Sequence, residues 1–416
     1  MEYLVISGGN KLEGQLSISG AKNAALPIIT AALMGTGSSV LENIPNLRDI
    51  NNLIEILDFL GAEVEYSNGS LGVNTNKVNQ LNVPYFLARK MRASYYVLGA
   101  LLGRFGYAAT SLPGGCEIGS RPIDLHLKGF KALGAEVEIE HGVVEVKGEN
   151  LTGAKIYLDY PSVGATSNIM MAAVMAEGQT MIENVAREPE IIDLANYLNV
   201  MGAKIKGAGT DVIRIEGVEE LHGGEYTIIP DRIEAGTYMM AAAITGGNLN
   251  IDNVLVEHVK PLIAKLKEMG VEIEEDVNSV IVRADKELTS VDIKTLPYPG
   301  FPTDMQSQFM ALLTQSRDSS LVVETVFENR FGHVDELQRM GAEIKIDGRT
   351  AMVKHTKLSG AKVKATDLRA GAALILAGLV ADGETEIADI HHIERGYEEI
   401  VSKFKAVGAD IKQIEK

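Results

Sequence analysis

The chain has 416 residues, of which 46% are hydrophobic, with a net charge of −17 and a single cysteine. The length fits two to three domains, the acidic balance argues against nonspecific nucleic-acid binding, and one cysteine excludes an internal disulfide framework. No basic segment followed by an apolar stretch opens the chain, and the longest apolar run, residues 370–381, is shorter than the roughly 20 residues of a membrane span. We therefore expect a cytoplasmic protein without a signal peptide or membrane segment.

A short pattern, first seen as LGAEVE at residues 60–65, occurs six times at intervals of about 70 residues. An amphipathic helix precedes each copy, as at residues 53–60 and 262–269, and an alternating strand with one buried face follows it. Between the two, a glycine is expected to end the helix in the left-handed conformation. The six glycines are Gly61, Gly134, Gly202, Gly270, Gly341 and Gly408.

Each repeat also contains one helix that is apolar on nearly every side and rich in small residues, which predicts a buried helix. The six segments are residues 24–34, 93–102, 165–176, 235–244, 305–313 and 370–380. A unit therefore consists of a buried helix, strands and a surface helix. Six units suggest two domains of three units each, with sheets outside and helices within, although the periodicity alone also permits a six-unit ring.

Polar residues gather where these buried helices begin. Serine, threonine and aspartate at such places are often helix caps, and Thr303 and Thr366 fit that interpretation as well as a functional one. A cation faces the positive end of the helix dipole, where it has no stabilising role of its own, so an anion-binding pocket is indicated. The cations at helix starts are Lys22, Arg92, Arg232 and Arg369.

Other common sites are not indicated. The chain has no Walker loop and no GxGxxG after a strand, so a P-loop or Rossmann nucleotide site is not expected. It lacks paired metal-ligand spacings, so neither a metal site nor a cofactor is expected. The eight histidines are scattered and fit surface or packing positions.

The loop of residues 112–122, LPGGCEIGSRP, holds the only cysteine, Cys116. A lone cysteine is most often a small buried hydrophobic residue. Here three glycines flank it and Arg121 follows five residues later, so a mobile loop carrying a reactive thiol is the alternative.

Nine segments together resemble the family of UDP-N-acetylglucosamine 1-carboxyvinyltransferases, which are enolpyruvyl transferases. They are GAKNAALP (20–27), MRAS (91–94), LPGGCEIGSRPIDLH (112–126), SVGAT (162–166), PDRIEAGT (230–237), FPTDMQ (301–306), ETVFENRF (324–331), TDLRA (366–370) and IERGYE (393–398). The resemblance runs from end to end. The related 5-enolpyruvylshikimate-3-phosphate synthases share the six-unit architecture but not the glycine–cysteine loop.

The resemblance implies an α/β fold of two inside-out α/β barrel domains, each with three βαβαββ repeats related by three-fold pseudo-symmetry. The first domain would span residues 21–229, and the second residues 1–20 with 230–416. The active site would lie in the cleft between them, and the cysteine loop would fold over it as a lid once the sugar nucleotide has bound.

The resemblance also implies the reaction: transfer of the enolpyruvyl group of phosphoenolpyruvate to the 3′-hydroxyl of UDP-N-acetylglucosamine, with release of phosphate. Cys116 matches the acid that protonates carbon 3, can add to carbon 2, and is the thiol that fosfomycin attacks. Asp304 matches the base for the sugar hydroxyl.

Further positions of the family's site carry over one by one. Lys22, Arg121 and Arg395 match residues that hold phosphoenolpyruvate. Asn23 and Asp367 match polar partners at the reacting centre, and Arg330 and Arg369 are further members of the cleft. The positions matching contacts to the sugar nucleotide are Arg92, Arg121, Pro122, Ile123, Asp124, Leu125, Ser162, Val163, Gly164, Asp304, Val326 and Phe327.

Two positions depart from some family members. Tyr160–Pro161 stands where some have Lys-Val, and Tyr96 where some have tryptophan. These changes bear on nucleotide affinity and not on the reaction. Two other functions stay open: a catalytically silent UDP-N-acetylglucosamine-binding regulator of wall synthesis, and a shikimate-type transferase. Regulatory protein partners cannot be identified from the sequence.

Overall fold

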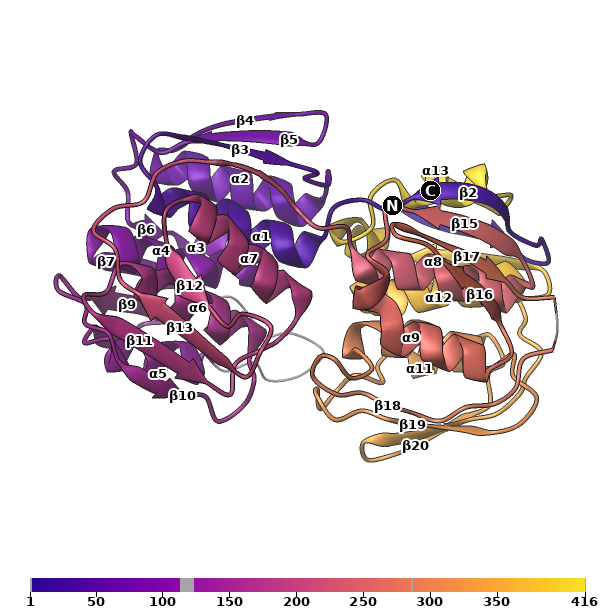
Figure 1. Cartoon of the computed structure of the whole chain (residues 1–416). Coiled ribbons are helices and arrows are strands. Elements are labelled where there is room, and N and C mark those ends of the chain that lie inside the picture. Colours follow the sequence, from indigo (N-terminus) through magenta and orange to yellow (C-terminus); the bar gives the residue numbers. More distant parts are fainter. Residues whose placement is uncertain (1, 113–122, 286, 416) are drawn as a thin grey trace. The chain divides into compact units, whose positions relative to one another are not determined.

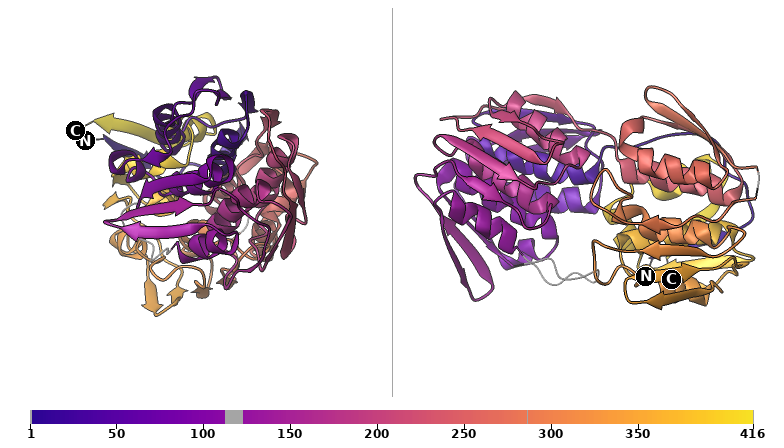
Figure 2. Two further views of the ribbon diagram at one scale, coloured as in Figure 1. Left: turned by 90° about the vertical axis from the view of Figure 1, so that its left-hand side faces the viewer. Right: turned by 60° about the horizontal axis from the view of Figure 1, so that its bottom comes forward.

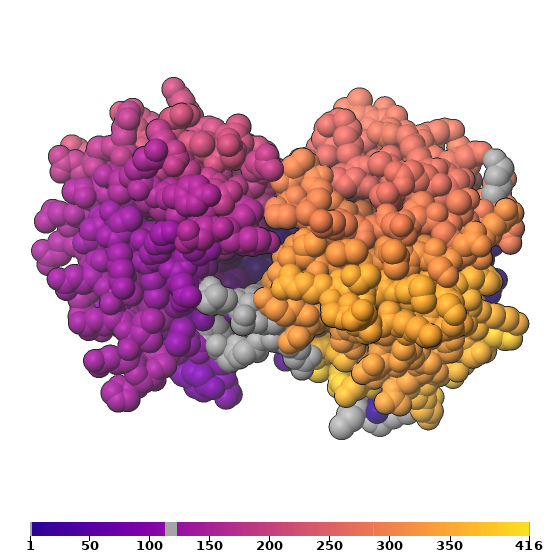
Figure 3. Space-filling model, turned by 90° about the horizontal axis from the view of Figure 1, so that it is seen from below, coloured from indigo at the N-terminus to yellow at the C-terminus, as the bar shows by residue number. Residues whose placement is uncertain are grey.

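The computed structural model describes residues 2–112, 123–285 and 287–415. These residues form two compact units (Figure 1). The first unit comprises residues 20–112 and 123–229, and the second comprises residues 2–19, 230–285 and 287–415. The space-filling view distinguishes them by colour, indigo to magenta for the first and mainly salmon to yellow for the second (Figure 3).

Each unit contains three four-stranded sheets among its described residues. The sheets of the first unit, each in spatial order, are β14 (Glu225–Thr227), β3 (Ser38–Glu42), β5 (Ser70–Asn74), β4 (Glu63–Ser67); β6 (Asn82–Val83), β7 (Tyr107–Ser111), β9 (Val143–Lys147), β8 (Glu136–Glu140); and β10 (Lys155–Tyr157), β11 (Gln179–Glu183), β13 (Val212–Glu216), β12 (Lys204–Lys206).

The sheets of the second unit are β2 (Glu13–Ser17), β15 (Asn248–Asp252), β17 (Ser279–Arg283), β16 (Glu272–Glu275); β18 (Ile293–Lys294), β19 (Ser320–Val323), β21 (Thr350–Val353), β20 (Ile344–Asp347); and β22 (Lys362–Lys364), β23 (Glu384–Ala388), β1 (Glu2–Ser7), β24 (Asp410–Glu415). In all six sheets the first two strands are parallel and the other neighbours antiparallel. This shared pattern confirms the six-fold repeat.

Buried helices form the centre of each unit, and the sheets lie outside them (Figure 2). In the first unit they are α1 (Lys22–Ala31), α4 (Tyr96–Phe105) and α6 (Val163–Val174); in the second, α8 (Arg232–Thr245), α10 (Gln306–Leu313) and α12 (Leu368–Val380). The expected buried helices are therefore confirmed. Three have 3₁₀ turns at one end: η1 (Ala32–Met34) follows α1, η2 (Arg92–Tyr95) precedes α4, and η3 (Thr303–Met305) precedes α10.

Small residues allow these helices to pack closely, as α4 and α6 show. A Cβ added to Gly99 would lie 2.3 Å from the carbonyl oxygen of Asn168. The buried Asn168 side chain also accepts a hydrogen bond from Gly99 N at 2.8 Å and donates one to Tyr95 O at 2.9 Å. The Asn168 side chain thus satisfies backbone groups where η2 joins α4 and the regular helical hydrogen bonds are interrupted.

The six repeat glycines have left-handed φ angles between 92° and 109°, as predicted. Each follows an outer helix, and a strand or extended segment continues from it. The outer helices are α2 (Arg48–Leu60), α5 (Asp124–Ala132), α7 (Pro189–Val200), α9 (Val256–Glu268), α11 (Val334–Arg339) and α13 (Ile400–Ala406). The short elements α3 (Tyr85–Ala88) and η4 (Ile390–Arg395) complete the set described.

Strand β14 returns from the end of the first unit to the sheet of β3, where Tyr226 lies opposite Leu41. Asp193 of α7 anchors it: Tyr226 Oη donates to one carboxylate oxygen at 2.5 Å and Ile229 N donates to the other at 3.2 Å. Burial raises the Asp193 pKa to about 6, although both hydrogen bonds oppose the rise.

Gly270 is a suitable position for testing whether the repeat glycines are needed for their left-handed φ angle. Its φ is 92° and an added Cβ would meet no atom within 4 Å. We expect Gly270→Ala to lower the free energy of unfolding by about 1 kcal/mol, because alanine disfavours the left-handed conformation. Urea unfolding measures the change. Gly332→Ala, also in open space but without a left-handed φ, should be neutral or slightly stabilising; equal losses would contradict the explanation.

Asp193 predicts a pH-dependent stability. Because its folded pKa of about 6 lies above the unfolded value, its stabilising contribution is lost as the pH rises through 6. Asp193→Asn stays neutral, so its stability relative to wild type should improve between pH 5 and pH 7.5, as urea midpoints at both pH values would measure. The exposed Asp159 provides the control Asp159→Asn. An Asp193→Asn difference that stays constant with pH would refute this prediction.

Candidate active site

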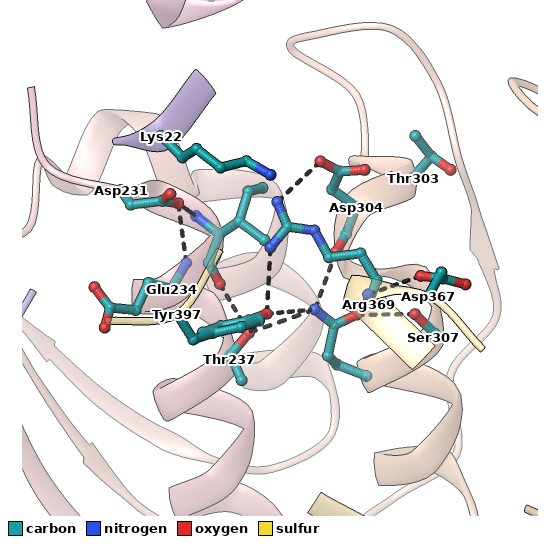
Figure 4. A network of polar contacts seen from close by, with 12 residues as sticks. Lys22, Asp231, Glu234, Thr237, Thr303, Asp304, Ser307, Asp367, Arg369 and Tyr397 are labelled. Carbon is teal, nitrogen blue, oxygen red and sulfur yellow. Dashed lines mark hydrogen bonds and ion pairs between the residues drawn. The ribbon is translucent and has the colours of Figure 1, made fainter. Parts of the chain in front are cut away.

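In the second unit, the carboxylate of Asp304 is held by two arginines. Arg330 Nη2 lies 2.9 Å from Oδ1. Arg369 Nη2 lies 3.1 Å from Oδ2 (Figure 4). Both arginine side chains are buried, at 3% and 5% exposure, whereas the Asp304 side chain is 30% exposed. The guanidinium groups favour the ionised carboxylate, which is the form that can accept a proton. Asp304 is therefore both anchored and accessible.

A hydroxyl group fixes the three helices behind this ion pair. Tyr397 Oη lies 2.9 Å from Thr237 Oγ1 of α8 and accepts from Gln308 Nε2 of α10 at 3.1 Å and from Arg369 Nη1 of α12 at 3.4 Å. Gln308 Nε2 also donates to Asp304 O at 3.0 Å. Burial raises the Tyr397 pKa, so the phenol stays protonated. The starts of α8, α10 and α12 therefore converge within this unit (Figure 4).

On the other side of Asp304, the buried Glu324 connects two segments. Its Oε2 accepts from Thr303 Oγ1 at 2.9 Å, and its Oε1 accepts from Val326 N at 2.7 Å and Phe327 N at 3.1 Å. Thr303 thus bonds to Glu324 and does not cap a helix. Two predicted site residues, Val326 and Phe327, are brought close to Asp304 through this carboxylate.

Asp367 caps α12: its Oδ1 accepts from Arg369 N at 2.7 Å and Ala370 N at 3.1 Å. Arg395 is half-buried at the end of η4. Behind them lies His333, which is fully buried; burial lowers its pKa to about 4, although the Asp367 charge opposes this. His333 is therefore neutral at physiological pH.

Asp231 and Glu234 lie at the start of α8 (Figure 4). Asp231 caps the helix, accepting from Ile233 N at 2.7 Å. Glu234 is buried, pairs with Lys403 at 2.7 Å and accepts from Ser19 N at 2.8 Å. Burial raises the Glu234 pKa to about 7, with Lys403 opposing the rise. Arg232 instead lies over the Tyr298 ring, at 5.7 Å from its centroid.

In the first unit, Lys22 begins α1 and its Nζ lies 3.2 Å from Asp49 Oδ2, with both side chains largely buried. The half-buried Asn23 follows it. The premise that cations at helix starts lack a stabilising role is wrong for Lys22 and Arg369, because Lys22 pairs with Asp49 and Arg369 with Asp304. Such pairs do not preclude binding of an anionic ligand.

Ser162 caps α6 by accepting from Ala165 N at 3.3 Å. Gly164, in the first turn, faces His126: an added Cβ would lie 3.2 Å from the imidazole Cε1 and Nε2. His126 Nδ1 accepts from the Asn168 amide at 2.9 Å, which assigns the proton of the neutral ring to Nε2. Burial, assisted by the Arg92 charge, lowers the His126 pKa to about 4.

Arg92 begins η2, with its guanidinium 5.6 Å from the Tyr95 ring centroid. Ile123, Asp124 and Leu125 lie where α5 begins, and Val163 starts α6. Tyr96 is half-buried at the start of α4, and Tyr160 is 42% exposed. Cys116, Arg121 and Pro122 lie outside the described residues.

Four residues that organise this geometry were not predicted from the sequence. Glu324 and Tyr397 lie inside segments that carry the resemblance, and Gln308 lies two residues beyond one, so their motif context was the available signal. Asp49 had no such signal. Within the part of the chain that the structure describes, no cluster of three or more histidine, cysteine or acidic residues could hold a metal ion.

Comparison with known proteins identifies the family. Residues 6–404 match the family described as EPSP synthase (3-phosphoshikimate 1-carboxyvinyltransferase). The UDP-N-acetylglucosamine 1-carboxyvinyltransferase of Halothermothrix orenii is 63% identical over 414 residues, covering 100% of both chains. UDP-N-acetylglucosamine 1-carboxyvinyltransferase 1 of Caldanaerobacter subterraneus is 59% identical, covering 98% of each.

Solved structures agree in fold. The enolpyruvyl transferase NikO from Streptomyces tendae superposes with a TM-score of 0.89 at 27% identity, covering 99% of this chain and 98% of that one. EPSP synthase from Acinetobacter baumannii has a TM-score of 0.78 at 17% identity over both whole chains, which shows the fold alone. The chain therefore belongs to the EPSP synthase family of enolpyruvyl transferases, and within it to the UDP-N-acetylglucosamine 1-carboxyvinyltransferases.

Proposed function

We propose that this chain transfers the enolpyruvyl group of phosphoenolpyruvate to the 3′-hydroxyl of UDP-N-acetylglucosamine and releases phosphate, the first committed step of peptidoglycan biosynthesis. The observation that carries the proposal is the 63% identity, over the whole of both chains, with a relative of that name. The described residues contain no helix long and apolar enough to cross a membrane. The proposal includes a cytoplasmic location and no nucleic-acid or membrane partner.

The reaction needs an acid, a base and fixed cations. A proton adds to carbon 3 of phosphoenolpyruvate while the sugar oxygen, losing its own proton, bonds to carbon 2. A proton then leaves the new methyl group and the bond from carbon 2 to the phosphate oxygen breaks. In the proposed assignment Cys116 supplies the first proton and Asp304 accepts the proton of the sugar hydroxyl.

The two anionic groups of phosphoenolpyruvate call for several cations. We assign Lys22, Arg121 and Arg395 to this task, with Asn23 and Asp367 beside the reacting atoms. The Lys22–Asp49 ion pair supports the assignment, because it fixes a largely buried ammonium group at a helix start.

The sugar nucleotide is assigned to Arg92, the segment 121–125, Ser162–Gly164 and the segment 326–327. The half-buried Gly164 accommodates the His126 ring, because a Cβ at this position would lie only 3.2 Å from the imidazole. Arg330 and Arg369 act on Asp304 and hold its carboxylate in one orientation. Orientation of this kind accounts for a large part of general-base efficiency.

The function is tested by phosphate release from phosphoenolpyruvate with UDP-N-acetylglucosamine or shikimate 3-phosphate as acceptor, before and after fosfomycin treatment. We expect release with the sugar nucleotide only, and loss after treatment, since Cys116 is the only cysteine. Cys116→Asp should keep activity and resist fosfomycin, because a carboxyl group can replace the acid but is not alkylated in this way; Cys116→Ala should lose most turnover.

Three other results would refute parts of this assignment. Release with shikimate 3-phosphate alone would indicate a shikimate-type transferase. Tight binding of UDP-N-acetylglucosamine without release would indicate a silent binding protein. Normal turnover by Cys116→Ala would exclude Cys116 as the acid.

Asp304 is tested by Asp304→Asn, which keeps the shape of the side chain but removes its basicity. We expect kcat to fall by about 10²- to 10⁴-fold, as for other general bases. Steady-state kinetics with both substrates measures this. Asp382→Asn is the matched control, because that carboxylate also pairs with a cation, Lys357, but is 69% exposed. A variant Asp304→Asn that retains wild-type kcat would exclude the base assignment.

A further inference from the structure

Glu324 is a buried carboxylate for which the reaction scheme has no role. It follows β19, is 1% exposed, and its described side-chain partners are one hydroxyl and two backbone N–H groups. Charge-assisted hydrogen bonds of this kind are stronger and geometrically better defined than neutral ones. The buried Glu324 carboxylate therefore fixes the positions of the hydroxyl and the two N–H groups that it binds.

All three partners lead to the candidate site. Thr303 precedes Asp304 in η3, so its bond to Glu324 fixes the backbone that carries the carboxylate. The other two partners are the N–H groups of the 326–327 segment, assigned above to the sugar nucleotide. The Phe327 ring lies 5.6 Å from the Arg330 guanidinium, which in turn binds Asp304.

We propose that Glu324 is a positioning residue that sets the geometry between the Asp304 carboxylate and the 326–327 segment. Its two oxygens divide the task, one binding Thr303 and the other binding the segment. The inference rests on the proposed function, because it assigns the base and the sugar-nucleotide segment to that reaction. It adds a residue that controls the position of the sugar 3′-hydroxyl relative to the Asp304 carboxylate.

The geometry also predicts which substitution is tolerated. In Glu324→Gln, the amide oxygen can accept both backbone N–H groups, and the amide nitrogen can donate to Thr303 once its hydroxyl rotates. Glu324→Ala loses all three bonds. A role in positioning therefore survives the glutamine variant, whereas a role in proton transfer would not.

Steady-state kinetics of both variants gives the test. We expect Glu324→Ala to lower kcat about 10- to 100-fold and to raise KM for UDP-N-acetylglucosamine about tenfold, because displacement by about 1 Å is sufficient for such losses. KM for phosphoenolpyruvate should stay within about twofold, and Glu324→Gln should restore every value to within about threefold of wild type.

Thr303→Val separates the two connections. It removes only the bond beside Asp304, so kcat should fall with KM for UDP-N-acetylglucosamine unchanged, and Thr303→Ser should restore kcat. Adding Thr303→Val to Glu324→Ala should cause no further loss, since the bond is already absent. If Glu324→Ala fails to fold, the Thr303 pair still tests the proposal.

Glu336 supplies a matched control for loss of a buried carboxylate. It is 5% exposed, lies in α11 of the same unit, and accepts from Lys364 N at 3.2 Å. Glu336→Ala should lower stability with kcat and both KM values unchanged. The proposal is overturned if Glu324→Ala has wild-type kinetics, if Glu324→Gln is as impaired as Glu324→Ala, or if Glu336→Ala gives the same kinetic changes. A wild-type protein without turnover refutes the proposed function instead.

Discussion

A charged group withdrawn from water must be paired or hydrogen-bonded, and this constraint shapes the interior of the second unit around Asp304. The helices α8, α10 and α12 are apolar along most of their length, so polar groups can gather only near their ends. There the buried Arg330 and Arg369 share the Asp304 carboxylate as a counter-charge. Removing that carboxylate would leave two buried cations without it as a counter-charge, which lowers stability. The same removal takes away the proposed base, which lowers turnover.

The repeat and the buried helices were predictable because they depend on local rules. A glycine that ends a helix, an apolar all-round segment and an alternating strand each have a signature within about ten residues. The helix starts were less predictable. The segment after Arg92 is divided into η2 and α4, and Asn168, a residue of a different repeat, binds Tyr95 O and Gly99 N where the two join. No local pattern near Arg92 announces that contact.

The candidate site likewise contains residues that could be predicted from the sequence and residues that could not. Resemblance supplied the residues expected to touch substrates, including Asp304 and Val326, but it did not supply the groups that hold them. Glu324 bonds to Thr303, 21 residues away, and Tyr397 bonds to Thr237, 160 residues away. The first contact lies within one repeat and the second joins two repeats, and neither has a signature in the local sequence. The bond between Asp49 and Lys22 was hidden for a similar reason, since Asp49 reads as an ordinary first-turn acid of α2.

Strand β1 lies between β23 and β24, so that Val5 is opposite both Glu386 and Lys412. The first unit is built from one continuous stretch of chain and can complete its core while synthesis continues. The second unit has no such freedom: its opening strand emerges first but acquires its neighbours only after nearly all other residues have been made. Strand β1 (Glu2–Ser7) therefore has no pairing partner in this sheet until the strands of the sixth repeat, β23 and β24, are present. A chain without the sixth repeat would leave β1 without its neighbours β23 and β24 and would expose its unpaired backbone groups to pairing with other chains.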